Sequence, residues 1–433
     1  MTAGTAGIVG AGIAGLSAAI GLRRAGWDVE VFERSQFKNE IGAAISVPPN
    51  ATRVLDHWGF DFARAGAVPN QASRFSRAAD LGVLLYTEYP DIREQMGAGS
   101  WSFHRVDLHR GLRELATGEG EGSRVRVRLG CEVVGVDCEG GEVRLEGGEV
   151  VKKDLVVIAD GAHSHLIEEF TGSPSELLRT GRSIYRWLVP MDDVLADADL
   201  RAQYDGLPGF ISWRDPAKDI MWVSYTCRGG KMLNNACVHN TQAGEGDEDL
   251  WHSDVTKEKV LAMLDNFHAT PRKIVQIASE DGIKVHHLFK RQALTTFVRG
   301  RAAIVGDAAH VMMPTHAAGG AIAIESAASL EVLFRGVDGG DAGLVRERLQ
   351  LFDRLRIPRC NLTMLASNAG PLWLEVPGVE EEVRRFYAGP LPPAGSFPWG
   401  DQFREVLFNH DEFKAAEAAL AEPPSGQGQG GGT

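Results

Sequence analysis

Apolar residues form unbroken runs at two places in the chain, 154–161 and 301–307. Continuous apolar runs of this length are typical of strands buried on both faces of a parallel sheet. The first run leads into Asp160 and the second into Gly306-Asp307. Open α/β sheets bind ligands at the carboxyl ends of their strands, so both acids are candidate ligand contacts.

A second part of the chain alternates between apolar and polar residues, which predicts β-strands with one buried face. These aromatic-rich segments are assigned to a separate sheet: 183–190, 208–213 and 219–227. In the last of them, alternation places Met221, Val223 and Tyr225 on one face. Residues 72–100 alternate weakly and are expected to add β-structure to this second region.

Helical periodicity and turn residues predict the remaining elements. Helices are expected over four segments: 51–58, 257–267, 321–333 and 345–366. Asn50 suits the N-cap of the first helix, and Pro358 should kink or split the last. Three further segments predict a small antiparallel meander: 125–129, 131–138 and 143–145. The polar stretch 238–253 is expected to be a loop, and 422–433 a disordered tail.

Residues 8–33 combine a short strand, a glycine turn, a helix and a second strand. The glycines follow the spacing G-x-G-x-x-G at Gly10, Gly12 and Gly15. In such a turn the first glycine permits the tight bend, the second lets backbone N–H groups approach a pyrophosphate, and the third lets the helix pack on the strand. Glu33 ends the second strand, near the offset of about 20 residues at which an acid bonds a ribose hydroxyl. The stretch predicts a site for an ADP-ribose-type group, which by itself fits either NAD or FAD.

The composition is that of a globular protein of 433 residues with 44% hydrophobic residues, long enough for two domains. A formal net charge of -13 argues against nucleic acid as a partner. The uncharged stretch 3–22 lacks a basic leader and is broken by turn glycines, so neither a signal peptide nor stable membrane insertion is expected. The five cysteines are scattered and lack zinc spacing, which indicates reduced thiols. We therefore expect a cytoplasmic monomer or homodimer without a bound metal.

Four features stand in one order along the chain: Gly10-x-Gly12-x-x-Gly15 with Glu33, Arg105 ahead of a predicted helix, Asp160-Gly161 after a buried strand, and Gly306-Asp307 with Pro314 and Gly319-Gly320. From residue 5 to about 367 this combination resembles the FAD-dependent single-component monooxygenases, the family of salicylate hydroxylase and 4-hydroxybenzoate hydroxylase. The segment 230–234 and the pair Arg356 and Arg359 extend the likeness. The resemblance implies an α/β fold. Its parts are a Rossmann-like FAD-binding domain of the 4-hydroxybenzoate hydroxylase type, an inserted, mainly β substrate domain, and C-terminal helices.

The family pattern implies a discontinuous domain organisation. The FAD-binding domain takes three segments: 1–72, 101–175 and 285–367. The substrate-binding β-sheet domain takes two: 73–100 and 176–284. A C-terminal helical segment, 368–420, and a disordered tail, 421–433, complete the chain.

The resemblance also implies contacts along the whole length of FAD. Asp307 would bond the ribityl chain, Arg105 would touch phosphate or ribityl oxygens, Asp160 would lie between the FAD and nicotinamide sites, and Pro314 would border the oxygen-reaction pocket. The helix N-terminus at 319–320 can offset negative charge on the reduced flavin ring. The full set of predicted cofactor contacts is Gly10, Gly12, Gly15, Glu33, Arg34, Ala44, Arg105, Asp160, Gly306, Asp307, Pro314, Gly319 and Gly320.

The sequence departs from the family pattern at three positions. Val311 stands where proline is usual, Ala318 replaces a common glutamine, and Ser326 stands where aspartate is usual. All three are expected to flank the flavin ring and to affect its reactivity, while FAD binding itself is still expected.

The implied activity is that of a monooxygenase that consumes NAD(P)H and hydroxylates a phenolic or other electron-rich aromatic compound. In the family chemistry NAD(P)H reduces the flavin, and O2 then adds at the flavin C4a to give an electrophilic hydroperoxide, which must be shielded from water. Arg186 and Tyr225 align with residues that contact the substrate in relatives, and His316 lies on the loop beside the flavin. Because only one dinucleotide fingerprint is present, NAD(P)H is expected to bind transiently.

Other interpretations stay open at this point. The same flavin chemistry could serve an epoxidase or an indole oxygenase of secondary metabolism. A flavin dehydrogenase or reductase that makes no productive use of oxygen, and a catalytically silent nucleotide-binding protein, also fit the fingerprint. Arg186, Tyr225 and His316 each have an ordinary alternative as a surface arginine, a packed tyrosine and a loop histidine. The identity of the substrate and the choice between NADH and NADPH are left open.

Overall fold

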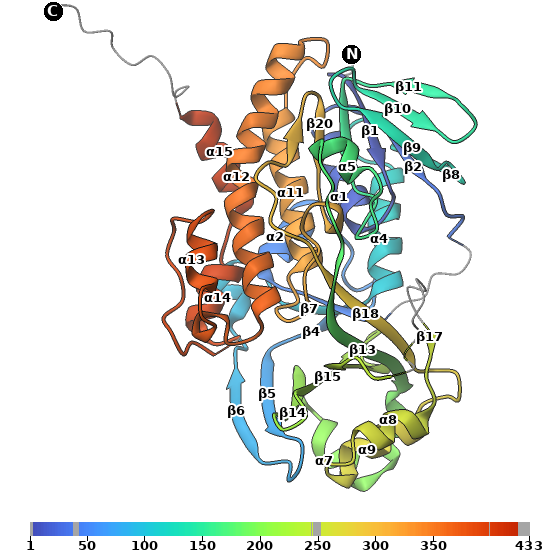
Figure 1. The fold of residues 1–433 in the computed structure, drawn as a ribbon, viewed down its shortest axis with the longest axis vertical. Helices are drawn as coiled ribbons and strands as arrows, with labels where there is room; N and C mark the ends of the chain where they lie inside the picture. Colours follow the sequence, from blue (N-terminus) through green and yellow to red (C-terminus); the bar gives the residue numbers. More distant parts are fainter. Residues whose placement is uncertain (1–2, 38–42, 244, 246–252, 398, 423–433) are drawn as a thin grey trace, which may run out of the picture.

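Two β-sheets dominate the architecture, and helices line one flank of both. The computed structural model describes residues 3–37, 43–243, 245, 253–397 and 399–422. In Figure 1 the first sheet lies in the upper half and the second in the lower half, with the C-terminal helices on the left. This arrangement leaves the carboxyl ends of the first sheet's strands turned toward the second sheet.

The first sheet is the parallel sheet that the apolar runs predict. Its order is β19-β20-β12-β1-β2-β8, and all neighbours except β19 and β20 pair in parallel. Its strands are β1 (Thr5–Val9), β2 (Asp28–Glu33), β8 (Arg126–Leu129), β12 (Leu155–Ile158), β19 (Val298–Arg299) and β20 (Ala302–Ile304). The strand β12 lies near the middle and is buried at every position, which explains why its sequence has no polar face.

The predicted meander is wrong at its first strand. Segment 126–129 forms β8 and pairs in parallel with β2, because both strands extend the same sheet. The meander consists instead of β9 (Val133–Asp137), β10 (Glu142–Leu145) and β11 (Val150–Lys152).

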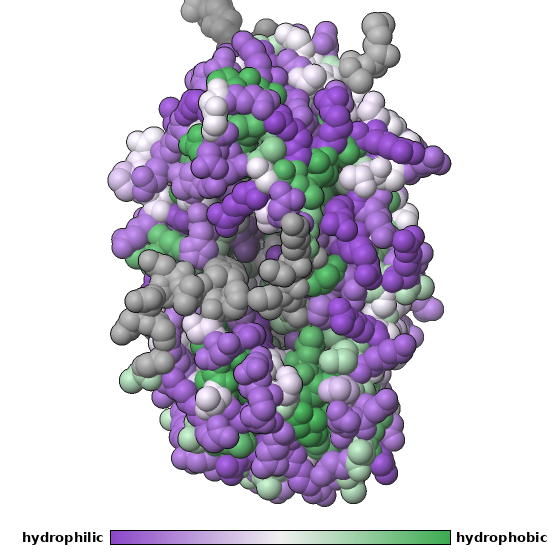
Figure 2. All heavy atoms as spheres, turned by 90° about the vertical axis from the view of Figure 1, so that its right-hand side faces the viewer, coloured by the Kyte–Doolittle hydropathy of each residue, from purple (hydrophilic) through white to green (hydrophobic). Residues whose placement is uncertain are grey.

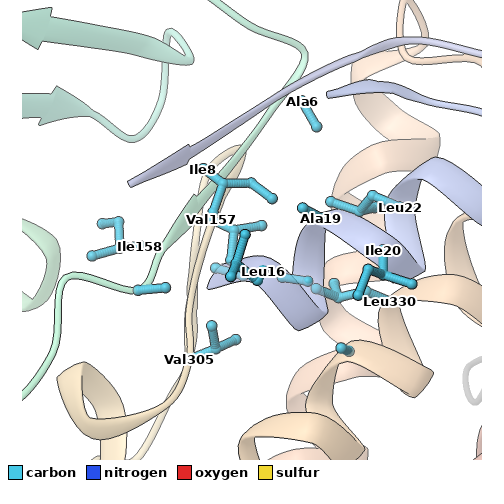
Figure 3. Close-up of a cluster of buried hydrophobic side chains, with 14 of the residues drawn as sticks. Ala6, Ile8, Leu16, Ala19, Ile20, Leu22, Val157, Ile158, Val305 and Leu330 are labelled. Atoms are coloured by element: carbon cyan, nitrogen blue, oxygen red, sulfur yellow. The ribbon is translucent and has the colours of Figure 1, made fainter. Parts of the chain in front are cut away.

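Helices rich in small and aliphatic residues cover the first sheet. The helix that follows the glycine turn, α1 (Ile13–Arg24), packs between the sheet and α11 (Gly319–Phe334). Figure 3 shows part of this core, with Ile8 of β1, Val157 of β12 and Leu16 of α1 in one cluster. Four more elements of this part are α2 (Pro49–His57), α4 (Arg105–Thr117), α5 (Ile167–Thr171) and α10 (Asp307–His310). Arg105 is thus the first residue of its helix and does not precede it.

The second sheet has eight strands in the order β17-β18-β13-β16-β15-β14-β5-β6. They are β5 (Ala72–Arg77), β6 (Val83–Glu88), β13 (Leu178–Pro190), β14 (Phe210–Asp215), β15 (Ile220–Cys227), β16 (Met232–Asn240), β17 (Ser253–Asp254) and β18 (Lys284–Lys290). One face packs into a core with helices α6 (Met191–Ala196), α7 (Ala198–Tyr204), α8 (Lys257–Met263) and α9 (Ala269–Ile277). The other face is turned toward the first sheet and lines a cavity.

Two boundaries differ from those predicted. The stretch 238–253, expected to be a loop, begins with the end of β16 and ends with the start of β17, while 244 and 246–252 lie outside the described residues. The strand β18 pairs with β13, so residues 285–290, which open the predicted segment 285–367, lie in the second sheet. The strands β17 and β18 thus form one edge of the second sheet.

A small sheet links the two large ones. It contains β3 (Ala44–Val47), β4 (Val68–Pro69) and β7 (Trp101–His104), and a short helix, α3 (Ile92–Met96), precedes β7. The backbone N–H of Ala44 donates to Oδ1 of Asn234 in β16, at 2.9 Å. This contact fixes β3 against the second sheet.

The C-terminal part folds back over both sheets. Its elements are α12 (Ala342–Ala369), the 3-10 turn η1 (Trp373–Glu375), α13 (Val379–Arg384), α14 (Asp401–Phe408) and α15 (Glu412–Ala421). The helix α12 continues through Pro358 as one element, and α15 packs against α11. Asn50 lies inside α2 and does not cap it: its side chain donates to Glu325 of α11, at 2.6 Å. The predicted tail lies outside the described residues from 423 onward.

The face in Figure 2 is mainly hydrophilic, with scattered hydrophobic groups. Among the described helices none combines the length and the apolar character that crossing a membrane requires. All five cysteines are free thiols.

Candidate active site

The glycine turn after β1 has the geometry of a phosphate-binding loop. Gly10 has a φ of +94°, and a Cβ there would meet the carbonyl oxygen of Ala159 at 2.6 Å. A Cβ on Gly15 would lie 1.9 Å from the carbonyl oxygen of Gly10, whereas a Cβ on Gly12 would meet nothing within 4 Å. No side chain caps the N-terminus of α1. The turn therefore leaves open space in front of free backbone N–H groups, as an anionic phosphate requires.

The acid at the end of β2 faces the same turn. Oε2 of Glu33 accepts a hydrogen bond from the backbone N–H of Ala11, at 2.8 Å, and Oε1 accepts one from the N–H of Ser35, at 2.7 Å. Its neighbour Arg34 is exposed, and its charge opposes the pKa shift of Asp160. Glu33 and Arg34 thus lie beside the glycine turn, where the adenosine end of a dinucleotide would be.

Two further acids lie at the carboxyl ends of neighbouring strands. Asp160 follows β12, and burial raises the pKa of its carboxyl group. Neither of its oxygens meets a hydrogen-bond partner of normal geometry among the described residues, although Ser164 is close enough to oppose the pKa shift. A buried carboxylate without partners suggests that a bound group supplies them.

The second of these acids, Asp307, opens α10 at the end of β20. Asp307 has an exposed surface and lines the cavity between the two sheets. Burial within the fold raises the pKa of its carboxyl group, and the charge of Arg105 opposes that shift. The preceding Gly306 has a φ of +66°, and a Cβ there would lie 2.5 Å from Cβ of Ala14, so this turn packs tightly against α1.

A cavity of about 430 Å³ separates the two sheets. From the side of the first sheet it is bounded by segment 43–46, Arg105, Asp307 and segments 311–315 and 317–320. From the side of the second sheet it is bounded by β13, β14, β15, β16, β18 and β5. Eight of the predicted site residues line it: Ala44, Arg105, Arg186, Tyr225, Asp307, Pro314, Gly319 and Gly320.

Register explains which side chains of the second sheet reach the cavity. One row of paired residues crosses five strands: Arg186, Ala236, Val223, Ser212 and Phe75. All five line the cavity. Because side chains alternate between the two faces of a strand, their chain neighbours Trp187, Cys237 and Trp222 point into the opposite core. The predicted shared face of Met221, Val223 and Tyr225 is confirmed by the same cavity.

Arg186 is the arginine of the second sheet that lines the cavity. It forms no ion pair with any carboxylate among the residues that the structure describes. Burial, and to a smaller extent the charge of Arg105, lower the pKa of Arg186, and Tyr225 opposes this shift. Burial raises the pKa of the Tyr225 hydroxyl above its ordinary value, so Tyr225 is neutral and can donate a hydrogen bond. An anionic ligand would relieve the cost of the buried guanidinium.

The N-terminus of α11 forms the opposite wall. Ala318 is its N-cap and offers no capping side chain, so the first backbone N–H groups of the helix, from Gly319 onward, are free. A Cβ on Gly320 would approach Ile45 to 3.1 Å, which shows how closely this turn packs on β3. The end of the helix therefore presents hydrogen-bond donors and a positive dipole to the cavity.

His316, a predicted site residue, does not line the cavity. It is fully buried outside the cavity lining, its Nδ1 lies 3.2 Å from Oγ of Ser367, and its ring packs against Phe403. Burial lowers its pKa to about 3. Of the three departures from the family pattern, Val311 and Ala318 line the cavity. The third, Ser326, does not: its Oγ accepts a hydrogen bond from Arg356, at 3.2 Å.

Several lining residues were not predicted. On the second sheet they are Phe75, Phe210, His286, His287 and Leu288, and from the C-terminal segment they are Pro371 and Trp399. Alternation along β14 could have placed Phe210 and Ser212 together. His286 and His287 lie within β18. Nothing in the local sequence pattern points to Trp399, because only the path of the chain brings it to the cavity.

One more cluster of ionisable groups lies behind α11. Ligand atoms of Glu325, His410 and Glu412 come within 4.8 Å of one another. Both carboxylates are already paired with arginines: Glu325 with Arg356 and Arg359, and Glu412 with Arg356. The cluster is therefore a buried ion-pair network that joins helices.

Comparisons with known proteins agree with this geometry. The family model described as "FAD binding domain" matches residues 3–360. The FAD-dependent monooxygenase cfoG of Aspergillus candidus is 33% identical over 84% of this chain and 84% of its own. Hispidin-3-hydroxylase of Neonothopanus nambi is 29% identical over 83% of this chain and 86% of its own. The 3-amino-4-hydroxybenzoate 2-monooxygenase of Streptomyces cremeus is 29% identical over 81% of this chain and 83% of its own.

Solved structures share the fold at lower identity. A salicylate hydroxylase substrate complex has a TM-score of 0.75 at 22% identity and covers 97% of this chain and 99% of its own. CtdE in complex with FAD and a substrate has a TM-score of 0.76 at 20% identity and covers 96% of this chain and 97% of its own. The predicted α/β fold with an inserted β-sheet region and C-terminal helices is confirmed.

Proposed function

Because this chain belongs to the FAD-binding family of FAD-dependent aromatic monooxygenases, we propose that it hydroxylates a phenolic or other electron-rich aromatic compound at the expense of NAD(P)H and O2. The observation that carries the proposal is the cavity wall at Arg186 and Tyr225, a cation and a neutral hydroxyl on one otherwise largely apolar sheet face. Such a pair suits a ligand that is flat and apolar at one end and anionic, as a phenolate is, at the other.

The residues around the cavity fit FAD. The glycine turn with Glu33 would hold the adenosine and pyrophosphate, Asp307 and Arg105 the ribityl chain, and the N-terminus of α11 the ring. When bound, the flavin accepts a hydride from NAD(P)H and activates O2 for transfer of one oxygen atom to the substrate. With a single dinucleotide fingerprint, the nicotinamide cofactor would bind transiently.

The protein's own groups would act on the substrate in three ways. The guanidinium of Arg186 would stabilise the phenolate form, which is the more electron-rich and more reactive form. The Tyr225 hydroxyl would donate a hydrogen bond to the substrate and orient the ring. Apolar walls, including Val223, Phe210 and Met221, would exclude water from the reacting atoms.

The test is turnover by the FAD-loaded protein with a panel of phenols. We expect phenol-stimulated NADPH oxidation, matching O2 consumption and a product heavier by one oxygen atom. NADPH oxidation without such a product would identify a reductase or an uncoupled flavoprotein. An epoxide or an oxidised indole as the main product would redirect the proposal to those substrates.

Variants test the assignment of the substrate site. Arg186→Gln should weaken phenol binding roughly 30-fold or more, the equivalent of about 2 kcal/mol for losing one partner of a buried charge pair. Tyr225→Phe removes one neutral hydrogen bond and should cost about threefold to tenfold. Arg182→Gln is the matched control, because Arg182 lies on the same strand but pairs with Asp219 away from the cavity. Equal phenol affinities in Arg186→Gln and Arg182→Gln would remove the site assignment.

A further inference from the structure

One end of the cavity is closed by the segment that follows α12. Pro371 and Trp399 line it there, next to Phe210 and Phe75 of the second sheet. Both Pro371 and Trp399 lie beyond residue 360, where the match to the family model ends. This wall is therefore made by a part of the chain that the shared FAD-binding pattern does not specify.

Aromatic side chains build the wall around Trp399. Its ring lies 5.3 Å from that of Phe210 and 4.8 Å from that of Phe408, measured between centroids. Phe75 is 5.6 Å from Phe210 and 4.6 Å from Phe397 of the same C-terminal segment. Edge and tilted packing of this kind fixes ring orientations. Three of these residues, Phe75, Phe210 and Trp399, line the cavity with apolar side chains.

The backbone at Trp399 is held in an unusual conformation by a hydrogen bond from Arg404. Its φ is +67°, a conformation that a bulky residue adopts only where its surroundings impose it. The Arg404 side chain donates from Nη1 to the Trp399 carbonyl oxygen, at 2.5 Å, and its guanidinium lies 4.6 Å from the ring centre of Tyr89. Tyr89 in turn donates to Oδ1 of Asn70, at 3.2 Å. The indole is thus fixed in place with respect to the second sheet.

The distance between this wall and Arg186 sets the length of the ligand that can use both. Arg186 lies on β13 and Phe210 on β14, and the order β13-β16-β15-β14 puts three strand spacings between them. At about 4.8 Å for each spacing, the two backbones are roughly 14 Å apart. A single phenol ring is much shorter than this backbone separation, so a ligand with a second ring can contact Arg186 and the aromatic wall together more extensively than phenol can.

We propose that Trp399 is a specificity-determining residue that selects phenols carrying a second flat ring or an apolar extension at the end remote from the hydroxyl. The phenolic oxygen lies at Arg186 and the extension packs against Trp399, Phe210 and Phe75. The inference rests on the proposed function, since it presumes that a phenol binds in this cavity.

The test compares phenol with 4-phenylphenol as probes of the FAD-loaded protein. Each is titrated while the flavin absorbance spectrum is followed, which gives a dissociation constant without turnover. The unaltered protein should bind 4-phenylphenol at least tenfold more tightly than phenol. In Trp399→Leu this preference should fall at least fivefold, while the dissociation constant for phenol changes less than twofold.

Trp373→Leu is the matched control, because Trp373 is buried in the same C-terminal cluster but does not line the cavity. It should keep the full preference for 4-phenylphenol. If Trp399→Leu does not fold, Trp399→Phe decides, because its smaller ring should still lower the preference at least twofold. An unchanged preference in the folded Trp399 variant overturns the inference.

The two proposals fail in different ways. If no phenol of any size perturbs the flavin spectrum of the unaltered protein, the proposed function fails and the role of Trp399 fails with it. If phenol and 4-phenylphenol bind with equal strength, the phenol site stands and only the role of Trp399 is overturned.

Discussion

At residue scale, the glycines of the first turn are required for different reasons. Gly15 has no room for a side chain, because the carbonyl oxygen of Gly10 occupies that space. Gly12 has room, since a Cβ there would meet no atom of the protein. The constraint at Gly15 therefore comes from the fold, and the constraint at Gly12 would come from the ligand.

Substituting each glycine by alanine separates the two roles. Gly15→Ala should destabilise the FAD-free protein by about 1–3 kcal/mol through overpacking against the backbone. Gly12→Ala should cost at most about 1 kcal/mol, the loss of a favourable N-cap. It should nevertheless weaken FAD binding roughly tenfold, about 1.4 kcal/mol, by intruding on the pyrophosphate. Thermal unfolding of the FAD-free variants and FAD titration measure both effects. Unimpaired FAD binding by Gly12→Ala would contradict the placement of the pyrophosphate.

Two buried histidines make stability depend on pH. Burial lowers the pKa of His310 to about 4 and that of His316 to about 3. In the unfolded chain both titrate near 6.5, so below that pH the unfolded state binds protons that the folded state does not. The free energy of unfolding should fall by roughly 1.4 kcal/mol per pH unit for each histidine between pH 6.5 and about 4.

His316→Phe tests this titration and the revised role of His316 together. The variant should lose one of the two contributions, so its denaturant midpoint should depend less steeply on pH between 6.5 and 4. Turnover at neutral pH should stay within about threefold of the unaltered enzyme, because His316 does not reach the cavity. The exposed N-cap His268 provides the control for turnover: His268→Asn keeps a capping acceptor away from the cavity and should leave turnover unchanged. A large loss of turnover in His316→Phe would restore a site role for His316.

At the scale of elements, the ion-pair network joins the helices behind the cavity. Glu325 of α11 bonds Arg356 at 2.9 Å and Arg359 at 3.0 Å, both on α12, and accepts from Asn50 of α2. Arg356 also pairs with Glu412 of α15. Burial opposes ionisation of Glu325, but the charges of Arg359 and Arg356 outweigh it and hold the pKa of that carboxyl below its usual range. The network therefore fixes α11, whose first turn lines the cavity.

Removing the charge of Glu325 should be strongly destabilising. Glu325→Gln leaves two buried guanidinium groups undercompensated and should lower the free energy of unfolding by about 3–5 kcal/mol at pH 7. In the unaltered protein the stabilisation by Glu325 is complete above its unfolded pKa of about 4.5 and is lost as pH falls toward its depressed folded pKa. The variant should lack that part of the acid sensitivity. Denaturant unfolding between pH 7 and 3 measures both effects.

An exposed glutamate supplies the comparison for this measurement. Glu380 forms a solvent-exposed pair with Arg384 on α13. Glu380→Gln should leave the unfolding midpoint nearly unchanged, because exposed pairs contribute little. Similar losses in Glu325→Gln and Glu380→Gln would show that the buried network has no special role.

At the scale of the whole molecule, the proposed cofactor site extends from one part of the fold to another. The glycine turn lies at the start of the first sheet, Asp307 and the N-terminus of α11 lie further along, and the second sheet forms the far wall. A dinucleotide that extends from the glycine turn to the cavity would contact both places, whereas one half of it would contact only one of them.

FAD should therefore stabilise the protein more than its flavin half does. At 100 times its dissociation constant, FAD should add about 2.7 kcal/mol to the free energy of unfolding of the FAD-free protein. FMN at the same concentration should add much less, because it lacks the adenosine that the Gly10–Gly15 turn would hold. Thermal unfolding with FAD, FMN and no ligand measures the difference. Equal stabilisation by FMN and FAD would exclude binding of the adenosine end at the glycine turn.

The sequence by itself determined the features that depend on short-range patterns. Apolar runs identified β12 and β20, the glycine spacing identified the turn after β1, and alternation identified the cavity face of β15. Each of these follows from the chain period of a strand or from the backbone demands of one turn, so neighbouring residues contain the necessary information.

Only the tertiary structure decided which elements meet. In the folded chain β8 pairs with β2, and His316 packs against Phe403. Asn50 donates to Glu325 instead of capping a helix, and Trp399 lines the end of the cavity. A periodic pattern shows that a residue faces inward, but it does not show which distant segment covers that face. Such contacts join residues tens to hundreds of positions apart, and they are selected by packing of the complete chain.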